Sequence, residues 1–240
     1  MRTPLIACAA LAFSALGAAD AAADRRFQVE PTRLSLSTEA PAGALVLANQ
    51  GTEPLRLQVA AYRWSEDADG AMRLEPAPEI VVRPAIVEIE AGRARTLRVG
   101  TTATSGAVEG TYRVFVEELP DRRPRAASQV QVLTRIGVPV FVVPQRPSIR
   151  LAARPDGPGV IAVRNSGTAH VKLARVGLAA VRGSEARWRH EAAGWYVLPG
   201  AERRFRVDVG RDACEASDLL AITLVDEDGR STTSSVPCGR

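Results

Sequence analysis

Leu-Val-Leu-Ala-Asn-Gln-Gly-Thr, at residues 45–52, is the stretch that decides the fold of this chain of 240 residues. A second copy, Ile-Ala-Val-Arg-Asn-Ser-Gly-Thr, stands at residues 161–168, about one domain length further along. In each copy an apolar run leads into Asn-x-Gly-Thr, and an alternating run follows at 55–57 or at 171–173. Because Asn and Gly permit positive φ, each copy predicts a tight turn between the two strands of a hairpin.

A second element recurs after each hairpin. Residues 89–92, Ile-Glu-Ala-Gly, precede an alternating run at 96–99, and residues 198–200, Leu-Pro-Gly, precede one at 205–209. The two halves therefore carry hairpin, turn and strand in the same order. This duplication predicts two related β-sandwiches.

The remaining sequence supplies enough strands for both sandwiches, because each half contains seven candidate runs, the number that an immunoglobulin-like domain needs. The runs of the first half are 27–37, 43–48, 55–64, 80–88, 95–99, 111–118 and 129–143. Those of the second half are 148–154, 159–165, 171–180, 188–197, 203–209, 219–226 and 231–237. Prolines and glycines break nearly every window of helix length. We therefore predict an all-β fold of two immunoglobulin-like domains, at 24–144 and 145–240, joined near Pro144–Pro147.

The N-terminus has the pattern of an export signal. Arg2 supplies a positive charge, and an apolar run from Leu5 to Ala19, too short to span a bilayer, ends in small residues. We expect a cleaved signal peptide at residues 1–23 and no stable membrane insertion; a short membrane anchor is the alternative. Removal of the signal takes Cys8 with it. The two remaining cysteines, Cys214 and Cys238, then favour one disulfide over two free thiols.

Composition and motifs argue against catalysis and against nucleic-acid binding. The formal net charge is +4, Lys172 is the only lysine, and no block of like charge forms a basic tail. His170 and His190 have no neighbouring Cys, Asp or Glu at metal spacing, and no Gly-x-Ser-x-Gly elbow or phosphate-binding glycine loop occurs. We expect both histidines at the solvated surface, and no catalytic residue, metal or cofactor. The alternative from the enzyme class is a small hydrolase or metal enzyme built on a sandwich.

The last strand of the first half is a candidate for binding another polypeptide. In residues 129–143, Val130 and Val132 alternate with glutamines before the apolar residues become continuous. An edge strand with exposed apolar side chains invites other strands to pair with it, which is tolerated where pairing is the function. The alternative is that Val130 and Val132 face the core of their own sandwich.

An ordered set of short motifs in residues 27–144 resembles the PapD-like periplasmic pilus chaperones. It comprises Glu30-Pro31-Thr32-Arg33, Asn49-Gln50-Gly51, Pro84, Ile89-Glu90-Ala91-Gly92, Thr111-Tyr112-Arg113, Glu118-Leu119-Pro120, Thr134-Arg135-Ile136 and Pro144. The pattern Val-Pro-Val-Phe-Val around Pro139 is more similar to the archaic, spore-coat-U-type branch of that family. The second half matches mainly in architecture.

The resemblance implies a function and a set of partners. A chaperone of this family works in the periplasm, where it binds pilin-type subunits that lack a final strand and passes them to an outer-membrane usher. By donor-strand complementation, the chaperone would lend its last first-domain strand to the subunit, with Val130, Val132 and Leu133 entering the groove. Residues 121–128 would form the loop before this strand.

The resemblance also implies a basic anchor for the C-terminal carboxylate of the subunit. Arg33 matches the first of its two residues, and a guanidinium suits a carboxylate because its planar fork binds both oxygens. At the second position the expected lysine is replaced by Gly137, so either Arg135 takes over the role or this branch fixes the subunit differently. A competing interpretation of the whole chain is an exported two-domain adhesion or structural module without chaperone activity.

Overall fold

The computed structural model describes residues 26–67, 69–120, 132–183, 185–207 and 217–238. The predicted signal peptide at 1–23, the predicted loop at 121–128, Val130 and Cys214 lie outside these residues. The described parts of the chain form strands and no helix, and they fold into two β-sandwiches, so the predicted fold class is confirmed. In these parts, no helix is long and apolar enough to cross a membrane.

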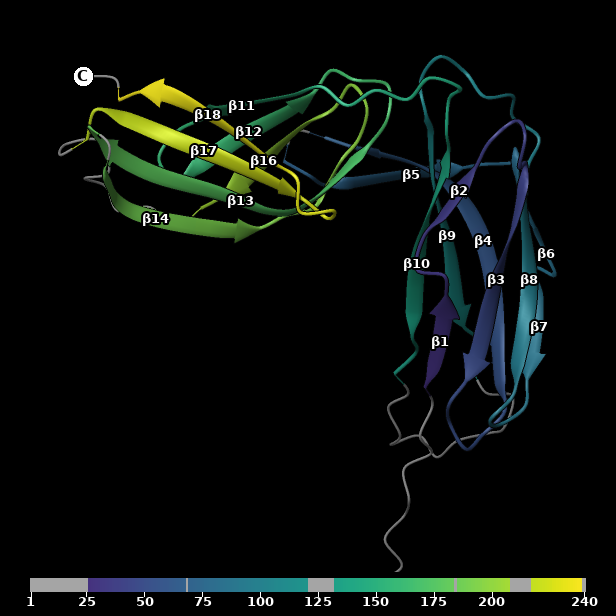
Figure 1. The fold of residues 1–240 in the computed structure, drawn as a ribbon. Helices are drawn as coiled ribbons and strands as arrows, with labels where there is room; N and C mark the ends of the chain where they lie inside the picture. Colours follow the sequence, from purple (N-terminus) through teal and green to yellow (C-terminus); the bar gives the residue numbers. More distant parts are fainter. Residues whose placement is uncertain (1–25, 68, 121–131, 184, 208–216, 239–240) are drawn as a thin grey trace, which may run out of the picture.

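Within the described residues, ten strands build the first sandwich, which lies on the right in Figure 1. They are β1 (Phe27–Glu30), β2 (Leu34–Leu36), β3 (Ala42–Asn49), β4 (Leu55–Glu66), β5 (Met72–Pro76), β6 (Ile80–Arg83), β7 (Ile86–Ile89), β8 (Ala94–Thr101), β9 (Gly110–Glu118) and β10 (Arg135–Val142). One sheet has the order β1-β3-β8-β6. The other has the order β2-β10-β9-β4-β5, with β7 also paired to β4.

The second sandwich has eight strands in the part of the chain that the structure describes. It meets the first at a wide angle, so that the molecule has the shape of an L (Figure 1). They are β11 (Leu151–Pro155), β12 (Val160–Asn165), β13 (Val171–Arg182), β14 (Glu185–Ala193), β15 (Tyr196–Val197), β16 (Glu202–Arg206), β17 (Leu219–Asp226) and β18 (Ser231–Pro237). The sheets have the orders β11-β12-β16 and β14-β13-β17-β18, with β15 also paired to β13. The segment at 144–147, where the sequence predicts the boundary, lies between β10 and β11.

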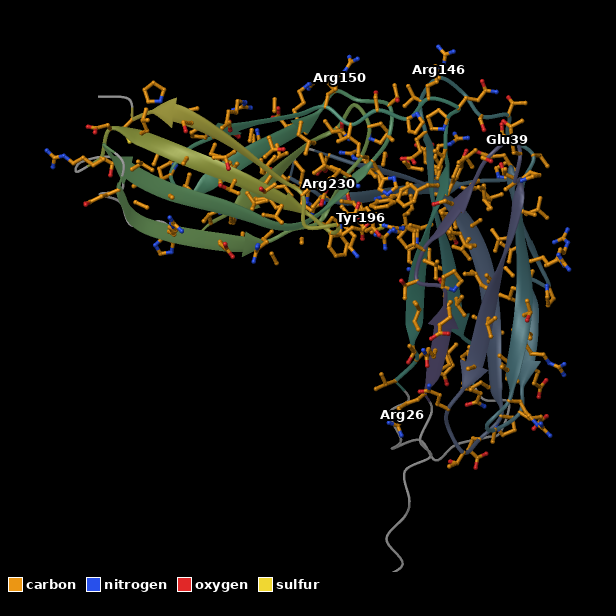
Figure 2. The ribbon with its side chains drawn as sticks, in the orientation of Figure 1. Arg26, Glu39, Arg146, Arg150, Tyr196 and Arg230 are labelled. Carbon is orange, nitrogen blue, oxygen red and sulfur yellow. The ribbon has the colours of Figure 1, made fainter. Side chains whose placement is uncertain are left out.

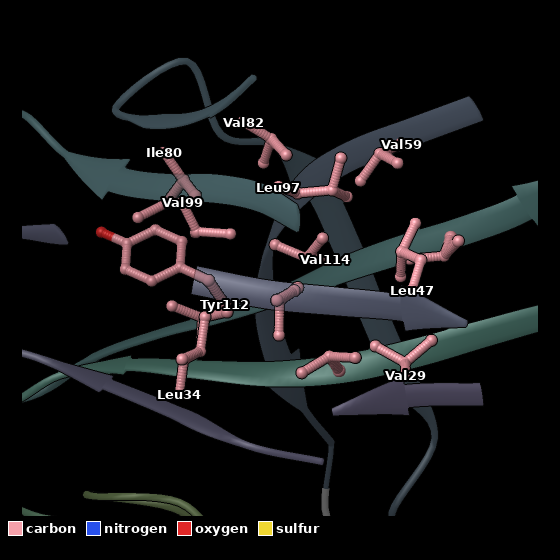
Figure 3. Packing of buried hydrophobic residues seen from close by; sticks show 14 of the residues in the cluster. Val29, Leu34, Leu47, Val59, Ile80, Val82, Leu97, Val99, Tyr112 and Val114 are labelled. Carbon is pink, nitrogen blue, oxygen red and sulfur yellow. The ribbon is translucent and has the colours of Figure 1, made fainter. Parts of the chain in front are cut away.

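The core of the first sandwich follows from the alternation of its strands. Successive strand residues point to opposite faces, so every second side chain of β3, β8 and β9 enters the space between the sheets. Leu47, Leu97, Val99 and Val114 are fully buried there, and Figure 3 shows them packed together. A separate apolar cluster around Ile161 and Ile222 fills the second sandwich.

Two predicted strands of the first half are each divided in two by a proline. The predicted strand at 27–37 becomes β1, which pairs with β3, and β2, which pairs with β10 in the other sheet. The predicted strand at 80–88 becomes β6, paired with β8, and β7, paired with β4. Pro31 and Pro84 separate the halves. At each proline the preceding peptide bond is cis, and the chain crosses there from one sheet to the other.

The hairpins predicted around Asn49 and Asn165 are wrong, because each turn connects one sheet to the other. β3 and β4 belong to different sheets, as do β12 and β13. The asparagines are buried and do not adopt positive φ. Instead, Asn49 Nδ2 donates to the carbonyls of Glu53 (2.8 Å) and Ile89 (3.0 Å), and Asn49 Oδ1 accepts from Gly51 N (2.9 Å).

Asn165 repeats this arrangement in the second sandwich. Its Nδ2 donates to the carbonyls of Ala169 (2.8 Å) and Val197 (3.1 Å), and its Oδ1 accepts from Gly167 N (3.0 Å). The turns after Ile89 and Val197 contain Gly92 and Gly200, which do have positive φ (66° and 75°). The duplicated sequence pattern therefore corresponds to one hydrogen-bonding arrangement that occurs in both sandwiches. In each, a buried asparagine links the turn between the two sheets to the chain just before a second, glycine-containing turn.

We predict that Asn49→Ala lowers the free energy of unfolding by about 2–4 kcal/mol, because two carbonyls and one N–H would lose their buried partner. The midpoint of urea denaturation measures this change. Gln50→Ala is the matched control, since Gln50 is the exposed neighbour and its loss should change stability by less than about 0.5 kcal/mol. Equal effects of the two substitutions would contradict the assigned role of Asn49.

Candidate functional site

The outer edge of β10 is only partly covered. β10 pairs with β9 along its whole length, from Arg135↔Glu117 to Val142↔Gly110. On its other side, β2 pairs only with residues 140–142. Among the described residues no strand lies against the outer edge of 135–139, which we call the open edge.

The hydrogen-bonding groups at the open edge follow from the pairing. Val143 N donates to Leu36 O (2.8 Å), so the odd-numbered residues of β10 turn their N–H and C=O groups away from β9. Pro139 agrees with this parity, because a proline must occupy a position that donates nothing to the neighbouring strand. The N–H and C=O groups of Arg135 and Gly137 therefore face the open edge, where another strand could pair with them.

Apolar side chains continue from β10 into the exposed segment before it. Ile136 and Val138 pack into the core of the first sandwich. Val132 and Leu133 precede the strand, which begins at Arg135 and not, as predicted, at residue 129; their residues are 82% and 41% exposed. Val132 therefore does not face the core of its own sandwich. Thr134 still follows β9, because its carbonyl accepts from Glu118 N (2.9 Å).

Arg33 lies between β1 and β2, where the two sandwiches meet. Its Nη1 forms an ion pair with Glu227 Oε1 of the second sandwich, and Lys172 Nζ lies 3.6 Å from Glu227 Oε2. The Lys172 ammonium is also 5.7 Å from the centre of the Tyr196 ring. Figure 2 shows Tyr196 at the inner corner of the L. A carboxylate is thus held between two cations, one from each sandwich.

The pKa values at this ion pair reflect their environment. The hydrogen bond to Glu227 raises the pKa of Arg33, although partial burial opposes the shift. Burial by itself would raise the pKa of the Glu227 carboxyl. The hydrogen bond from Arg33 and the charges of Arg33 and Lys172 outweigh burial and leave that pKa below its ordinary value.

The structure does not bring Arg135 to Arg33. Arg135 Nε pairs with Glu117 Oε1 (2.6 Å), and its guanidinium lies 3.9 Å from the centre of the Phe115 ring. Leu34 is paired with Val140, so Arg33 is level with Pro139, four residues from Arg135 along β10. At about 3.3 Å per residue, this is a separation of roughly 13 Å along the strand. The two arginines therefore do not share one carboxylate in this arrangement.

Aromatic side chains fill the junction between the sandwiches. Phe141 of β10 packs with Trp64, Tyr196 and Leu198 in one buried cluster. His170 stacks on Phe141 with ring centres 3.5 Å apart, and its Nδ1 lies 2.7 Å from Glu109 Oε2. The prediction of a solvated surface is therefore wrong for His170, whose side chain is 14% exposed; His190 is exposed. Phe141 ties the strand with the open edge directly to the second sandwich.

Charged side chains also cross the junction. Arg203 Nη1 of β16 lies 3.0 Å from Glu66 Oε2 of β4, whose side chain is buried. Burial raises the pKa of Glu66, although the Arg203 charge opposes the shift. Arg113 stands 4.2 Å from the centre of the Trp64 ring, and burial lowers its pKa. The Arg203–Glu66 contact joins the two sandwiches on the side of β4 and β16.

The cysteine prediction falls partly outside the described residues. Cys238 is disulfide-bonded, whereas Cys214, its predicted partner, lies outside the described residues, so the pairing stays a prediction. Within the described residues, no group of three or more His, Cys, Asp or Glu side chains could hold a metal ion.

Sequence reasoning missed the residues that face Arg33 across the junction. Lys172 stood out only as the single lysine, and no motif of the sequence analysis included Glu227. Each is local to the second sandwich, and nothing in the spacing relates either to residue 33. The angle between the sandwiches creates the contact.

Comparison with known proteins gives both a family match and similar folds. A family model described as the pili and flagellar-assembly chaperone, PapD N-terminal domain, matches residues 26–148. The fold is similar to a chain in the CsuC–CsuE chaperone–tip adhesion subunit pre-assembly complex from archaic chaperone-usher Csu pili of Acinetobacter baumannii. That TM-score is 0.62 at 21% identity, with 88% of this chain and 97% of that chain covered.

Two further crystal structures are similar. For the class 5 fimbriae chaperone CfaA, the TM-score is 0.60 at 16% identity, with 88% of this chain and 100% of that chain covered. For a chain of the Salmonella enterica SafA pilin–SafB chaperone complex, the TM-score is 0.57 at 15% identity, with 88% and 96% covered. At such identities the similarity shows the fold. No curated protein sequence matches the chain.

We predict that the Arg33–Glu227 pair stabilises the protein only above the acid range. Because the folded state lowers the pKa of Glu227, the contribution is present above the ordinary value of about 4.3 and is lost as the pH falls through the lowered folded value. Glu227→Gln should therefore reduce the free energy of unfolding by about 0.2–1 kcal/mol at pH 7 and by a smaller amount at an acidic pH below that ordinary value.

Urea denaturation at both pH values measures this difference. Asp228→Asn is the control, because Asp228 lies in the same turn and pairs with the exposed Arg230 instead. A destabilisation by Glu227→Gln that is equal at both pH values would contradict the prediction.

Proposed function

The chain belongs to the pili and flagellar-assembly chaperones with a PapD N-terminal domain, and we propose that it binds pilus subunits in the periplasm by donor-strand complementation. The observation that carries the proposal is the open edge of β10, where the backbone groups of Arg135 and Gly137 have no strand beside them among the described residues. A subunit that lacks its final strand has the complementary need, since its own edge and core are incomplete. Strand addition satisfies both.

Two kinds of interaction would hold the subunit at the open edge. Main-chain hydrogen bonds would form along 135–137, and the apolar side chains of the preceding segment would fill the groove of the subunit. We assign Val130, Val132 and Leu133 to the groove. Burial of each such side chain contributes about 1.5–3 kcal/mol. The exposure of Val132 and Leu133 supports this assignment, because an apolar pair left in water lacks a partner within its own sandwich.

Arg33 is our candidate anchor for the C-terminal carboxylate of the subunit. Its backbone is level with Pro139, next to the end of the open edge, and its guanidinium already holds one carboxylate, that of Glu227. A charge-assisted hydrogen bond of this kind fixes the position as well as the affinity of a ligand. We leave Arg135 out of the anchor, because it pairs with Glu117 at the other end of β10.

The finer assignments rest on sequence patterns and on the family. We propose the archaic, spore-coat-U-type branch from the Val-Pro-Val-Phe-Val pattern, and the fold similarity to a chain in the Csu complex is consistent with it. We further propose delivery of subunits to an outer-membrane usher, export by the signal peptide at 1–23, and a disulfide between Cys214 and Cys238. Donor-strand exchange needs no nucleotide, since folding of the subunit supplies the free energy.

Co-expression tests the proposal directly. The full chain is produced in a bacterial periplasm together with a candidate subunit lacking its final strand, and the chain is purified by affinity. Recovery of a one-to-one complex is expected. If every such subunit is degraded or aggregates as it does without the chain, the proposal is wrong and the competing adhesion or structural module is favoured.

We predict that Val132→Asp reduces subunit recovery to background while the chain remains soluble and folded. An unpaired carboxylate in an apolar groove costs several kcal/mol, and Val132 makes no core contact that the change would remove. Ile86→Asp is the matched control, because Ile86 is another exposed β-branched residue, on β7 and away from the open edge. Undiminished recovery with Val132→Asp would remove this segment from the donor strand.

We predict that Arg33→Ala lowers subunit recovery about 10- to 100-fold, since a hydrogen bond to a charged group contributes about 1.5–3 kcal/mol. Arg98→Ala, which removes an exposed arginine of β8, should leave recovery unchanged. Glu227→Gln weakens the same ion pair but keeps Arg33, so it separates the anchor from any effect on the junction. If Arg33→Ala binds subunit as the wild type does, Arg33 is not the anchor.

A further inference from the structure

The carboxylate of Glu227 is held by two cations that come from different sandwiches. Arg33 Nη1, from the β1–β2 connection, faces Oε1, and Lys172 Nζ, from β13, lies 3.6 Å from Oε2. Each oxygen thus faces its own cation. This is the arrangement that a polypeptide's C-terminal carboxylate would need, and here a side chain of the same molecule occupies it.

The backbone presents Glu227 independently of Arg33. Asp226 Oδ1 accepts hydrogen bonds from Asp228 N (3.0 Å) and Arg230 N (2.8 Å), which fix the turn between β17 and β18. Glu227 N donates to Lys172 O (3.0 Å), so residues 172 and 227 are neighbours in the second sandwich. Among the described residues of the first sandwich, only Arg33 reaches the carboxylate.

The three side chains are open to solvent, and a competing carboxylate can therefore reach them. The exposed fractions are 36% for Arg33, 43% for Lys172 and 34% for Glu227. Exposed ion pairs of this kind are weak because water screens them. Replacement of Glu227 by another carboxylate would conserve the charge of the site and exchange one weak contact for an equivalent one.

We infer that Arg33 and Lys172 together form the site for a polypeptide's C-terminal carboxylate, and that Glu227 occupies this site until such a carboxylate displaces it. This inference rests on the proposed function, because it names the second cation and the resting occupant of the anchor. The displaced Glu227 side chain turns into solvent. The interaction of Glu227 with the two cations thereby sets the binding free energy that a competing C-terminal carboxylate must exceed.

A second cation from the second sandwich makes the anchor depend on the junction. Lys172 is two residues beyond His170, which stacks on Phe141 and bonds Glu109 of the first sandwich. Arg33 is level with Pro139, two residues before Phe141. Both cations are therefore positioned by the contact between the sandwiches, and only a chain with that contact intact presents the pair.

A pair of short peptides tests the inference without a subunit. The probes are acetyl-Thr-Val-Thr-Val with a free C-terminal carboxylate and the same peptide as its C-terminal amide. Each is titrated into the full chain and followed by ¹H–¹⁵N NMR at the Arg33 side chain and at the amides of Lys172 and Glu227. Thermal denaturation checks that each variant is folded.

The expected result is carboxylate-dependent binding that Glu227 restrains. Glu227→Gln should tighten binding of the free-carboxylate peptide about tenfold, and Lys172→Met in the Glu227→Gln background should weaken it about tenfold. The amide peptide should cause no saturable shift at these positions. Asp228→Asn and Arg175→Met, which remove a carboxylate and a cation close by in the second sandwich, should leave the affinity as in the wild type.

Equal affinity of wild type and Glu227→Gln, or equal binding of acid and amide peptides, would overturn the inference. So would an unchanged affinity on Lys172→Met. These outcomes are distinct from a failure of the proposed function, which would appear as loss of subunit recovery by the wild-type chain in co-expression. A chain that recovers subunit but shows no effect of Glu227→Gln retains the chaperone role and refutes only the occupied anchor.

Discussion

Backbone groups of a strand require partners, and on the outer edge of β10 the described residues supply a neighbouring strand for residues 140–142 only. Pro31 ends the pairing of β1 with β3, after which the chain crosses to the other sheet and runs beside β10 for three residues. The rest of the outer edge has no strand beside it among the described residues. The position of the crossing, at Pro31, thus determines how much of β10 is covered by its own domain. The open edge is a consequence of strand switching, and it needs no separate device.

The junction between the sandwiches uses the same strand. Ile136, Val138, Val140 and Val142 face the first core, whereas Phe141 faces the opposite way and packs with Trp64, Tyr196 and His170. One strand therefore contributes to a core, to an interface and to an unpaired edge. The alternating geometry of a strand makes this possible, because the side chains of adjacent residues point to opposite faces of the sheet. Arg33 is positioned by the neighbouring β2, so the basic residue and the open edge keep a fixed relation.

The sequence predicted the two sandwiches, and the reason is visible in Asn49 and Asn165. Each makes the same three hydrogen bonds, which explains why the same residue types recur at these positions in both halves. The crossing between sheets was not predicted, since alternation is identical on both sides of Pro31 or Pro84. The partners of Arg33 and His170 were beyond reach for a different reason. They lie in the other sandwich, and only the angle of the junction brings them together.

Pro139 has one more consequence, which concerns alignment. A guest strand that pairs with Gly137 and Arg135 finds no donor at Pro139, and the next residues of β10 are already occupied by β2. The ladder must end there, whatever the length of the guest. The alignment of a polypeptide bound at this edge is thus fixed at one point, close to Arg33, and the place of each of its other side chains follows from its distance along the guest from that point.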